Sequence, residues 1–257
     1  YPACPLGRRQ AALTHVATNR HTCGMKILAV ADQECRALGE HFDSERWHGV
    51  DLVVACGDLK QSYLGYLADR FNTRVLYVRG NHDRGFGDDP PLGCEDIHGR
   101  LVEHRGVRIL GMEGSIWYNG SGVQYRERQV AIKAFRQRLK LWRAGGVDIV
   151  ISHSPPRFCA DAFSVCDRPV GDHALCPFRE RPESEWDNCP ESADRAHWGF
   201  DAFRKMINRY EPAYWIHGHT HAGYGMGDRW KQMGKTAVGD AYKYLEFEIP
   251  ARTEAIG

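Results

Sequence analysis

The sequence predicts an α/β fold, and three observations support this prediction. Short apolar segments recur along the chain, segments with helical spacing separate them, and polar residues that can bind metal ions directly follow several of them. Short apolar runs that alternate with helical patterns are typical of strands buried on both faces of a sheet. A length of 257 residues fits one domain with one sizeable core.

The predicted strands are the short apolar runs, which are rich in Val, Ile and Leu. They are expected at Ile27–Ala31, Leu52–Cys56, Val75–Val78, Val107–Leu110, Ile149–Ile151, Tyr214–Ile216, Lys235–Val238 and Tyr242–Ile249. The runs are three to eight residues long, which is typical of strands and too short for a typical helix.

Helices are predicted in four of the intervening segments. Two are Glu34–His48 and Lys60–Phe71, and a third is Trp198–Tyr210, which ends before Pro212. The fourth has one apolar stripe at helical spacing, formed by Ile132, Phe135, Leu139 and Trp142. Basic residues crowd this fourth helix, and we interpret them as a solvated face in preference to a nucleic-acid surface.

Two segments are expected to lie outside the core. Residues 1–24 lack the apolar stretch of a secretory signal and precede the first strand, so we interpret them as an extension to a single domain of residues 25–257. Residues 155–197 are polar and rich in Pro, and a structureless segment of this length is uncommon in a compact domain unless it has a function. Because it directly follows a strand and His153, we expect a lid-like insertion.

Composition excludes several classes of protein. The net charge of +1 gives no large electrostatic footprint, so a nucleic-acid ligand is not favoured. No apolar run reaches the roughly 18 residues of a membrane span, and we therefore expect a cytoplasmic protein without a membrane partner. The nine Cys include no C-x-x-C pair and specify neither disulfides nor a structural zinc. The sequence does not indicate an oligomeric state.

Five predicted strands are each followed by residues that can bind a metal ion. The carboxyl ends of strands line one crevice in an open α/β sheet, so side chains far apart in sequence are expected to converge there. Mixed oxygen and imidazole ligands suit two divalent ions such as Mn, Fe or Zn, and a carboxylate shared between the ions is expected at Asp58. The predicted metal ligands are Asp32, Asp58, Asn81, His153, His219 and His221.

In this order the motifs resemble those of the calcineurin-like metallophosphoesterases. The matching segments are Asp32, Gly57-Asp58, Gly80-Asn81-His82-Asp83, His153 and Gly218-His219-Thr220-His221. The resemblance implies a four-layer α/β/β/α sandwich with two mixed sheets. It implies that Asp32, Asp58 and His221 hold the first ion, and that Asp58, Asn81, His153 and His219 hold the second. It also implies a catalytic His82 that faces the substrate, with Asp83 orienting it.

One position departs from this family pattern. The family usually has His two residues after the first Asp, whereas this chain has Glu34. Glu34 is therefore a further candidate ligand, which would favour harder ions such as Mn or Fe. The alternative is that Glu34 opens a helix and leaves the first ion without that imidazole.

The predicted activity is that of a hydrolase that cleaves a small phosphoester, with a phosphodiester preferred over a monoester. A hydroxide that bridges the two ions would attack phosphorus, since bound cations lower the pKa of water. The alternative is a non-catalytic binding scaffold with the same fold. The intact set of candidate ligands argues against the scaffold, because a scaffold does not need them.

Overall fold

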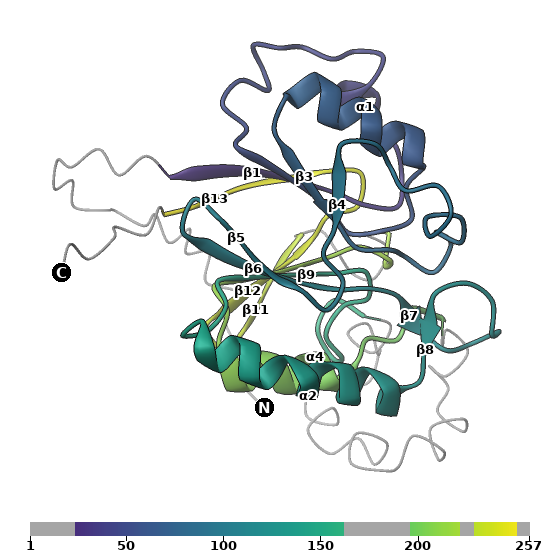
Figure 1. Cartoon of the computed structure of the whole chain (residues 1–257), viewed down its shortest axis with the longest axis vertical. Helices are drawn as coiled ribbons and strands as arrows, with labels where there is room; N and C mark the ends of the chain where they lie inside the picture. The colour runs from purple at the N-terminus through teal and green to yellow at the C-terminus, as the bar shows by residue number, and fades with distance from the viewer. Residues whose placement is uncertain (1–23, 162–195, 222–228, 251–257) are drawn as a thin grey trace, which may run out of the picture.

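Two mixed β-sheets form the centre of the protein (Figure 1). The computed structural model describes residues 24–161, 196–221 and 229–250. The first sheet has the order β13-β1-β2-β3-β4, with β13 antiparallel to β1 and the other neighbours parallel. Its strands are β1 (Met25–Val30), β2 (Leu52–Ala55), β3 (Arg74–Tyr77), β4 (Cys94–Asp96) and β13 (Leu245–Ile249).

The second sheet has the order β11-β12-β10-β9-β6-β5. Its four central strands are parallel, and each edge strand is antiparallel to its neighbour. The strands are β5 (Leu101–His104), β6 (Val107–Met112), β9 (Ile149–Ser152), β10 (Tyr214–His217), β11 (Trp230–Met233) and β12 (Thr236–Asp240). A separate parallel pair joins β7 (Ser115–Ile116) to β8 (Gln124–Tyr125).

Helices cover the outer faces of the two sheets (Figure 1). Helix α1 (Gln61–Phe71) packs on the first sheet, and helices α2 (Glu127–Arg143) and α4 (Asp201–Tyr210) pack on the second. A third apolar cluster lies between the sheets and takes residues from both. This arrangement is consistent with the four-layer α/β/β/α sandwich that the sequence resemblance implied.

Alternate side chains along a strand pack into different apolar layers. In β1, Ile27 and Ala29 pack between the two sheets, whereas Leu28 and Val30 face α1. In β10, Ile216 packs between the sheets and Trp215 faces α4. Successive side chains of a strand point to opposite faces, so an unbroken apolar run can serve two apolar layers at once.

All eight predicted strands are confirmed, with ends that differ by a few residues, but others were not predicted. The additional strands β4, β5, β8 and β11 consist largely of half-buried residues, and their sequences have no continuous apolar run. Strand β7 has only two residues. Such strands are held in place by their neighbours in the sheet, and pattern analysis does not detect them.

The predicted helix at Glu34–His48 is wrong. The segment has a short 3₁₀ helix at Arg36–Leu38 followed by turns. Gly39 follows the 3₁₀ helix, and the Asp43 side chain accepts a hydrogen bond from the backbone of Glu45 in a local turn, 2.9 Å. Such turns compete with a helical backbone. The other three predicted helices are confirmed, although α4 begins at Asp201 and not at Trp198.

The apolar stripe of α2 does not face the core. Ile132, Phe135, Leu139 and Trp142 are exposed, and Trp142 retains 77% of its accessible surface. The buried face consists of Val130, Ala134, Gln137 and Leu141, which contains one polar residue. In the described part of the structure, the most apolar face of α2 is therefore exposed to solvent.

Several predictions concern residues outside the described ranges. These include residues 1–23 of the predicted extension and residues 162–195 of the predicted lid-like insertion. The two ends of that insertion, at 155–161 and 196–197, are described. Among the described residues, the structure contains no helix with the length and apolar character that crossing a membrane requires.

Candidate metal centre

The candidate site lies where the carboxyl ends of both sheets meet. The first sheet contributes loops after β1, β2 and β3, and the second contributes loops after β9 and β10. Backbone hydrogen bonds join neighbouring loops within each sheet, from Asp32 N–H to Gly57 O at 3.1 Å in the first and from Gly218 N–H to His153 O at 3.0 Å in the second. Across the junction, the backbone N–H of His219 donates to Asp32 Oδ1 at 2.9 Å, and these two residues are 187 positions apart in the sequence.

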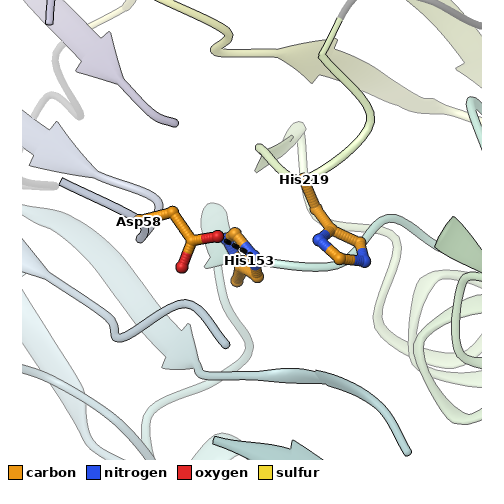
Figure 2. Close-up of side chains that lie close together, drawn as sticks. All are labelled: Asp58, His153 and His219. Atoms are coloured by element: carbon orange, nitrogen blue, oxygen red, sulfur yellow. Dashed lines mark ion pairs between the residues drawn. The ribbon is translucent and has the colours of Figure 1, made fainter. Parts of the chain in front are cut away.

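The centre of the site is a compact group of side chains (Figure 2). Asp58, His153 and His219 each offer one ligand atom, and these three atoms lie within 4.8 Å of one another. His153 Nε2 lies 3.4 Å from Asp58 Oδ2 and 2.9 Å from Asn81 Oδ1. We call Asp58, Asn81, His153 and His219 the buried half of the site, since their side chains are at most 9% exposed.

The neighbours of His153 set its protonation. Burial alone would lower the pKa of His153, but the negative charge of Asp58 outweighs it and raises the pKa to about 9. His153 Nδ1–H donates to Cys56 O at 2.8 Å, which leaves Nε2 directed at Asp58 and Asn81. His153 Nε2 thus faces two candidate ligand oxygens, Asp58 Oδ2 and Asn81 Oδ1.

These donors fit a divalent ion. Ligand atoms bound at about 2.0–2.2 Å to one ion lie roughly 3 Å from each other, which is close to the separations around His153 Nε2. A ligating His normally donates its other N–H to a carbonyl group, and Cys56 O accepts that bond here. Carboxylate, amide oxygen and imidazole together suit a borderline ion such as Mn, Fe or Zn.

His219 has the same type of support. Its Nε2–H donates to the carbonyl oxygen of Ala196 at 2.5 Å, so Nδ1 is the nitrogen with the free lone pair. Its ring centre lies 4.7 Å from that of His153. Burial, together with the nearby His153, lowers the pKa of His219 well below its usual value, so the ring is neutral as a ligand must be.

Two glycines allow the loops that form the buried half to pack closely. A Cβ on Gly80 would lie 2.1 Å from Asp58 Oδ1, and a Cβ on Gly57 would lie 2.4 Å from Gly80 N. The Asp83 carboxylate joins the same loops, since it accepts hydrogen bonds from Asp58 N–H at 2.8 Å and Gly80 N–H at 2.7 Å. Asp83 therefore fixes the backbone of the loops that carry Asp58 and Gly80. The expected role of Asp83 in orienting His82 stays a prediction.

Asp32 and His221 form the open half of the site. Both Asp32 oxygens accept the backbone N–H of His219 at 2.9 Å, and the Asp32 side chain is 1% exposed. Burial raises the pKa of Asp32 to about 7. His221 is 57% exposed, and its Nε2 lies 3.8 Å from Asp32 Oδ1. The open half thus joins a buried carboxylate to an exposed imidazole.

The backbone of the predicted ligands is strained. Asp32, Asp58, His219 and His221 all have positive φ, between 52° and 73°. Non-glycine residues rarely adopt this region, and it costs of order 1–3 kcal/mol per residue. Strain of this kind persists where the surrounding structure enforces it, and it is frequent at functional sites.

Two predicted residues lie at the edge of the site. The His82 side chain is 69% exposed, and its Nε2 lies 3.8 Å from Asp58 Oδ2, while its backbone N–H donates to Asp58 Oδ1 at 2.8 Å. Glu34 is 44% exposed and forms an ion pair with Lys60 at 3.1 Å.

Two contacts at the site were not predicted. The Asn81 amide donates to Tyr118 Oη at 3.2 Å, which fixes the amide with its oxygen toward His153. The ring of His197 lies against those of His219 and His221, with centres 5.0 and 5.8 Å away. Neither residue was singled out from the sequence as part of the metal site, and His197 has no signal beyond its residue type at the end of the Pro-rich insertion.

Comparisons with known proteins identify the family and a likeness of fold. The family model described as "Calcineurin-like phosphoesterase" matches residues 21–223. A curated relative, UPF0046 protein K07C11.7 of Caenorhabditis elegans, is 25% identical over 204 residues, which cover 68% of this chain and 58% of the relative. The aligned part thus spans less than two thirds of that relative. The solved structure of TT1561 from Thermus thermophilus has a TM-score of 0.55 at 12% identity, covering 89% of this chain and 100% of that one, a likeness of fold.

Proposed function

Because this chain belongs to the calcineurin-like phosphoesterase family, we propose that it hydrolyses a small phosphodiester with the help of two divalent metal ions. The observation that carries the proposal is the convergence of Asp58, Asn81, His153 and His219 where the two sheets meet. A carboxylate, an amide and two imidazoles in one buried group have no packing purpose, and burying them without a partner ion is costly.

The two halves of the site would divide the ligands. Asn81, His153 and His219 would hold one ion and Asp32 and His221 the other, with Asp58 shared between them. When bound, the ions would lower the pKa of water and neutralise charge on the phosphoryl oxygens. Mn, Fe and Zn are the candidates, since the donors mix oxygen with imidazole.

His82 is the proposed acid. Its backbone is fixed by the hydrogen bond to Asp58, while its exposed ring can reach a substrate above the ions. It would donate a proton to the leaving oxygen or stabilise the negative charge on the phosphoryl oxygens in the transition state. Asp83 supports this arrangement through the backbone of Asp58 and Gly80.

The preference for a small phosphodiester rests on charge. A net charge of +1 provides little attraction for a long polyanion, whose binding depends on many Lys and Arg contacts. Helix α2, which carries many basic residues, lies on the outer face of the second sheet. A cytoplasmic location is part of the proposal, and the oligomeric state is left open.

A screen of metal ions against substrates tests the proposal. The apoprotein would be loaded with Mn, Fe, Zn, Ni or Mg and assayed with model phosphate monoesters and diesters. We expect turnover with at least one of Mn, Fe and Zn, and a higher kcat/KM for diesters.

His82→Ala is the internal control. It should lower kcat by about 10²–10⁴-fold while metal content stays unchanged, since His82 is an acid and not a ligand. Loss of metal in this variant would show that His82 is a ligand. Absence of turnover with every ion would favour the binding scaffold.

A further inference from the structure

His197 is a fourth imidazole at the candidate metal centre, beside those of His153, His219 and His221. Its ring lies 5.0 Å from that of His219 and 5.8 Å from that of His221, centre to centre. Two imidazoles bound to one ion through nitrogen at about 2.1 Å would have ring centres roughly 5 Å apart. The pair His153 and His219, which belongs to the buried half, has a spacing of 4.7 Å. His197 thus lies within the range of rings that share an ion.

The backbone around His197 is held in place by the chain that follows β9. Phe200 N–H donates to Pro155 O at 3.1 Å, and Arg157 N–H donates to Phe200 O at the same distance. Arg157 Nε donates to Gly199 O at 2.8 Å. Trp198 is fully buried, and Arg157 stacks over its ring at 5.5 Å. These contacts fix the position of the backbone segment that carries His197.

The residue before His197 already contacts a candidate ligand. Ala196 O accepts the Nε2–H of His219 at 2.5 Å. The carbonyl group of Ala196 therefore orients His219 in the buried half, and the adjacent imidazole of His197 lies beside His221 in the open half. Such a hydrogen bond couples the position of this segment to the geometry of the site.

The open half lacks donors that the buried half has. The buried half has four side chains, whereas the open half has Asp32, His221 and a share of Asp58. Glu34 does not complete it, because its carboxylate pairs with Lys60 at 3.1 Å and is partly exposed. A divalent ion bound by three protein donors can accept another imidazole.

We propose that His197 is a metal ligand of the open half, where it supplies the imidazole that Glu34 does not. Rotation of the exposed His221 side chain would bring its nitrogen and that of His197 onto one ion with Asp32. This inference rests on the proposed function, and it assigns a residue of the lid-like insertion to the metal centre.

Metal binding tests this assignment without an activity assay. The apoprotein would be titrated with Co²⁺, and bound metal would be measured by its visible absorption and by elemental analysis. We expect two equivalents for the wild type. His197→Ala should bind one equivalent with unchanged affinity and the second at least about tenfold more weakly. The matched control is His48→Ala, an exposed His that precedes β2 at the opposite end of that strand.

A rescue variant separates a ligand from a structural role. Glu34→His combined with His197→Ala places an imidazole two residues after Asp32 and should restore the second equivalent. Thermal unfolding would show whether each variant is folded. The assignment is overturned if His197→Ala keeps both equivalents at wild-type affinity, or if Glu34→His fails to restore a lost one. A wild type that binds no Co²⁺ would instead refute the proposed function itself.

Discussion

The two halves of the candidate site differ in how their ligands are held. In the buried half, Asp58 Oδ2 and Asn81 Oδ1 lie 3.4 and 2.9 Å from His153 Nε2, and no side chain is more than 9% exposed. In the open half, Asp32 is as deeply buried, but its partner His221 is 57% exposed and 3.8 Å away. One half is preorganised, whereas the proposed ligand set of the other requires the exposed His221 side chain to move.

The difference indicates an order of metal binding. A preorganised ligand set loses little conformational entropy when an ion binds, whereas an exposed His loses rotamer freedom. We therefore expect the buried half to bind its ion more tightly and first. Asp58 is the proposed link between the halves, because its carboxylate is assigned to both proposed ligand sets.

The largest effect is expected from Asp58→Asn, which would disrupt both halves. Removing the shared charge should abolish binding of both ions and lower kcat/KM by at least about a thousandfold, as loss of several kcal/mol of metal stabilisation implies. Metal content by elemental analysis, together with steady-state kinetics, checks this. Asp69→Asn on the exposed face of α1 is the matched control. Retention of both ions by Asp58→Asn would show that the carboxylate is not shared.

Next in size is a comparison of His153→Gln with His221→Gln. His153→Gln should weaken the tighter ion, while His221→Gln should weaken only the second one, each by at least about tenfold. Isothermal titration with Mn²⁺ would resolve the two affinities. Equal losses at both sites from either variant would mean that the halves do not bind independently.

A smaller effect is expected on the stability of the metal-free protein. Folding raises the pKa of Asp32 to about 7 and that of His153 to about 9. The neutral acid and the charged imidazole are both favoured in the folded state, so stability is lost as pH rises through these values. Between pH 6 and 9, Tm in the presence of a chelator should fall, by on the order of 5 °C.

Saturating Mn²⁺ should reverse this trend, because metal ligands must be deprotonated and affinity then rises with pH. Circular dichroism at the two pH limits, with chelator and with Mn²⁺, measures both slopes. A metal-free Tm that rises with pH over this range would contradict the charged state of His153.

The smallest effect is expected from Glu34→Gln. Its ion pair with Lys60 is partly exposed, so its loss should change the free energy of unfolding by less than about 1 kcal/mol. Metal stoichiometry should stay at the wild-type value. If Glu34→Gln lost one ion, Glu34 would be the missing ligand of the open half, and His197 would not be needed there.

Much of the fold could be predicted because buried strands leave a strong signal. The runs at Ile27, Leu52 and Ile149 are apolar on both faces, and a strand between two apolar layers requires this. The segment Glu34–His48 was predicted wrongly, because Gly39 and the Asp43 turn outweigh helical propensity there. For α2 the helix was predicted correctly, but the apolar stripe did not identify the buried face.

The sequence alone determined which chemical groups follow each strand, since the order of Asp32, Asp58, Asn81, His153 and the His219 motif can be read directly from the chain. It could not determine that Asp83 acts through backbone N–H groups, that Tyr118 orients Asn81, or that His197 reaches the centre. Those contacts join residues 25 to 37 positions apart, or belong to the end of a long insertion. Covalent order fixes which groups are available, whereas only tertiary packing fixes which of them meet, because distances across loops depend on the whole fold.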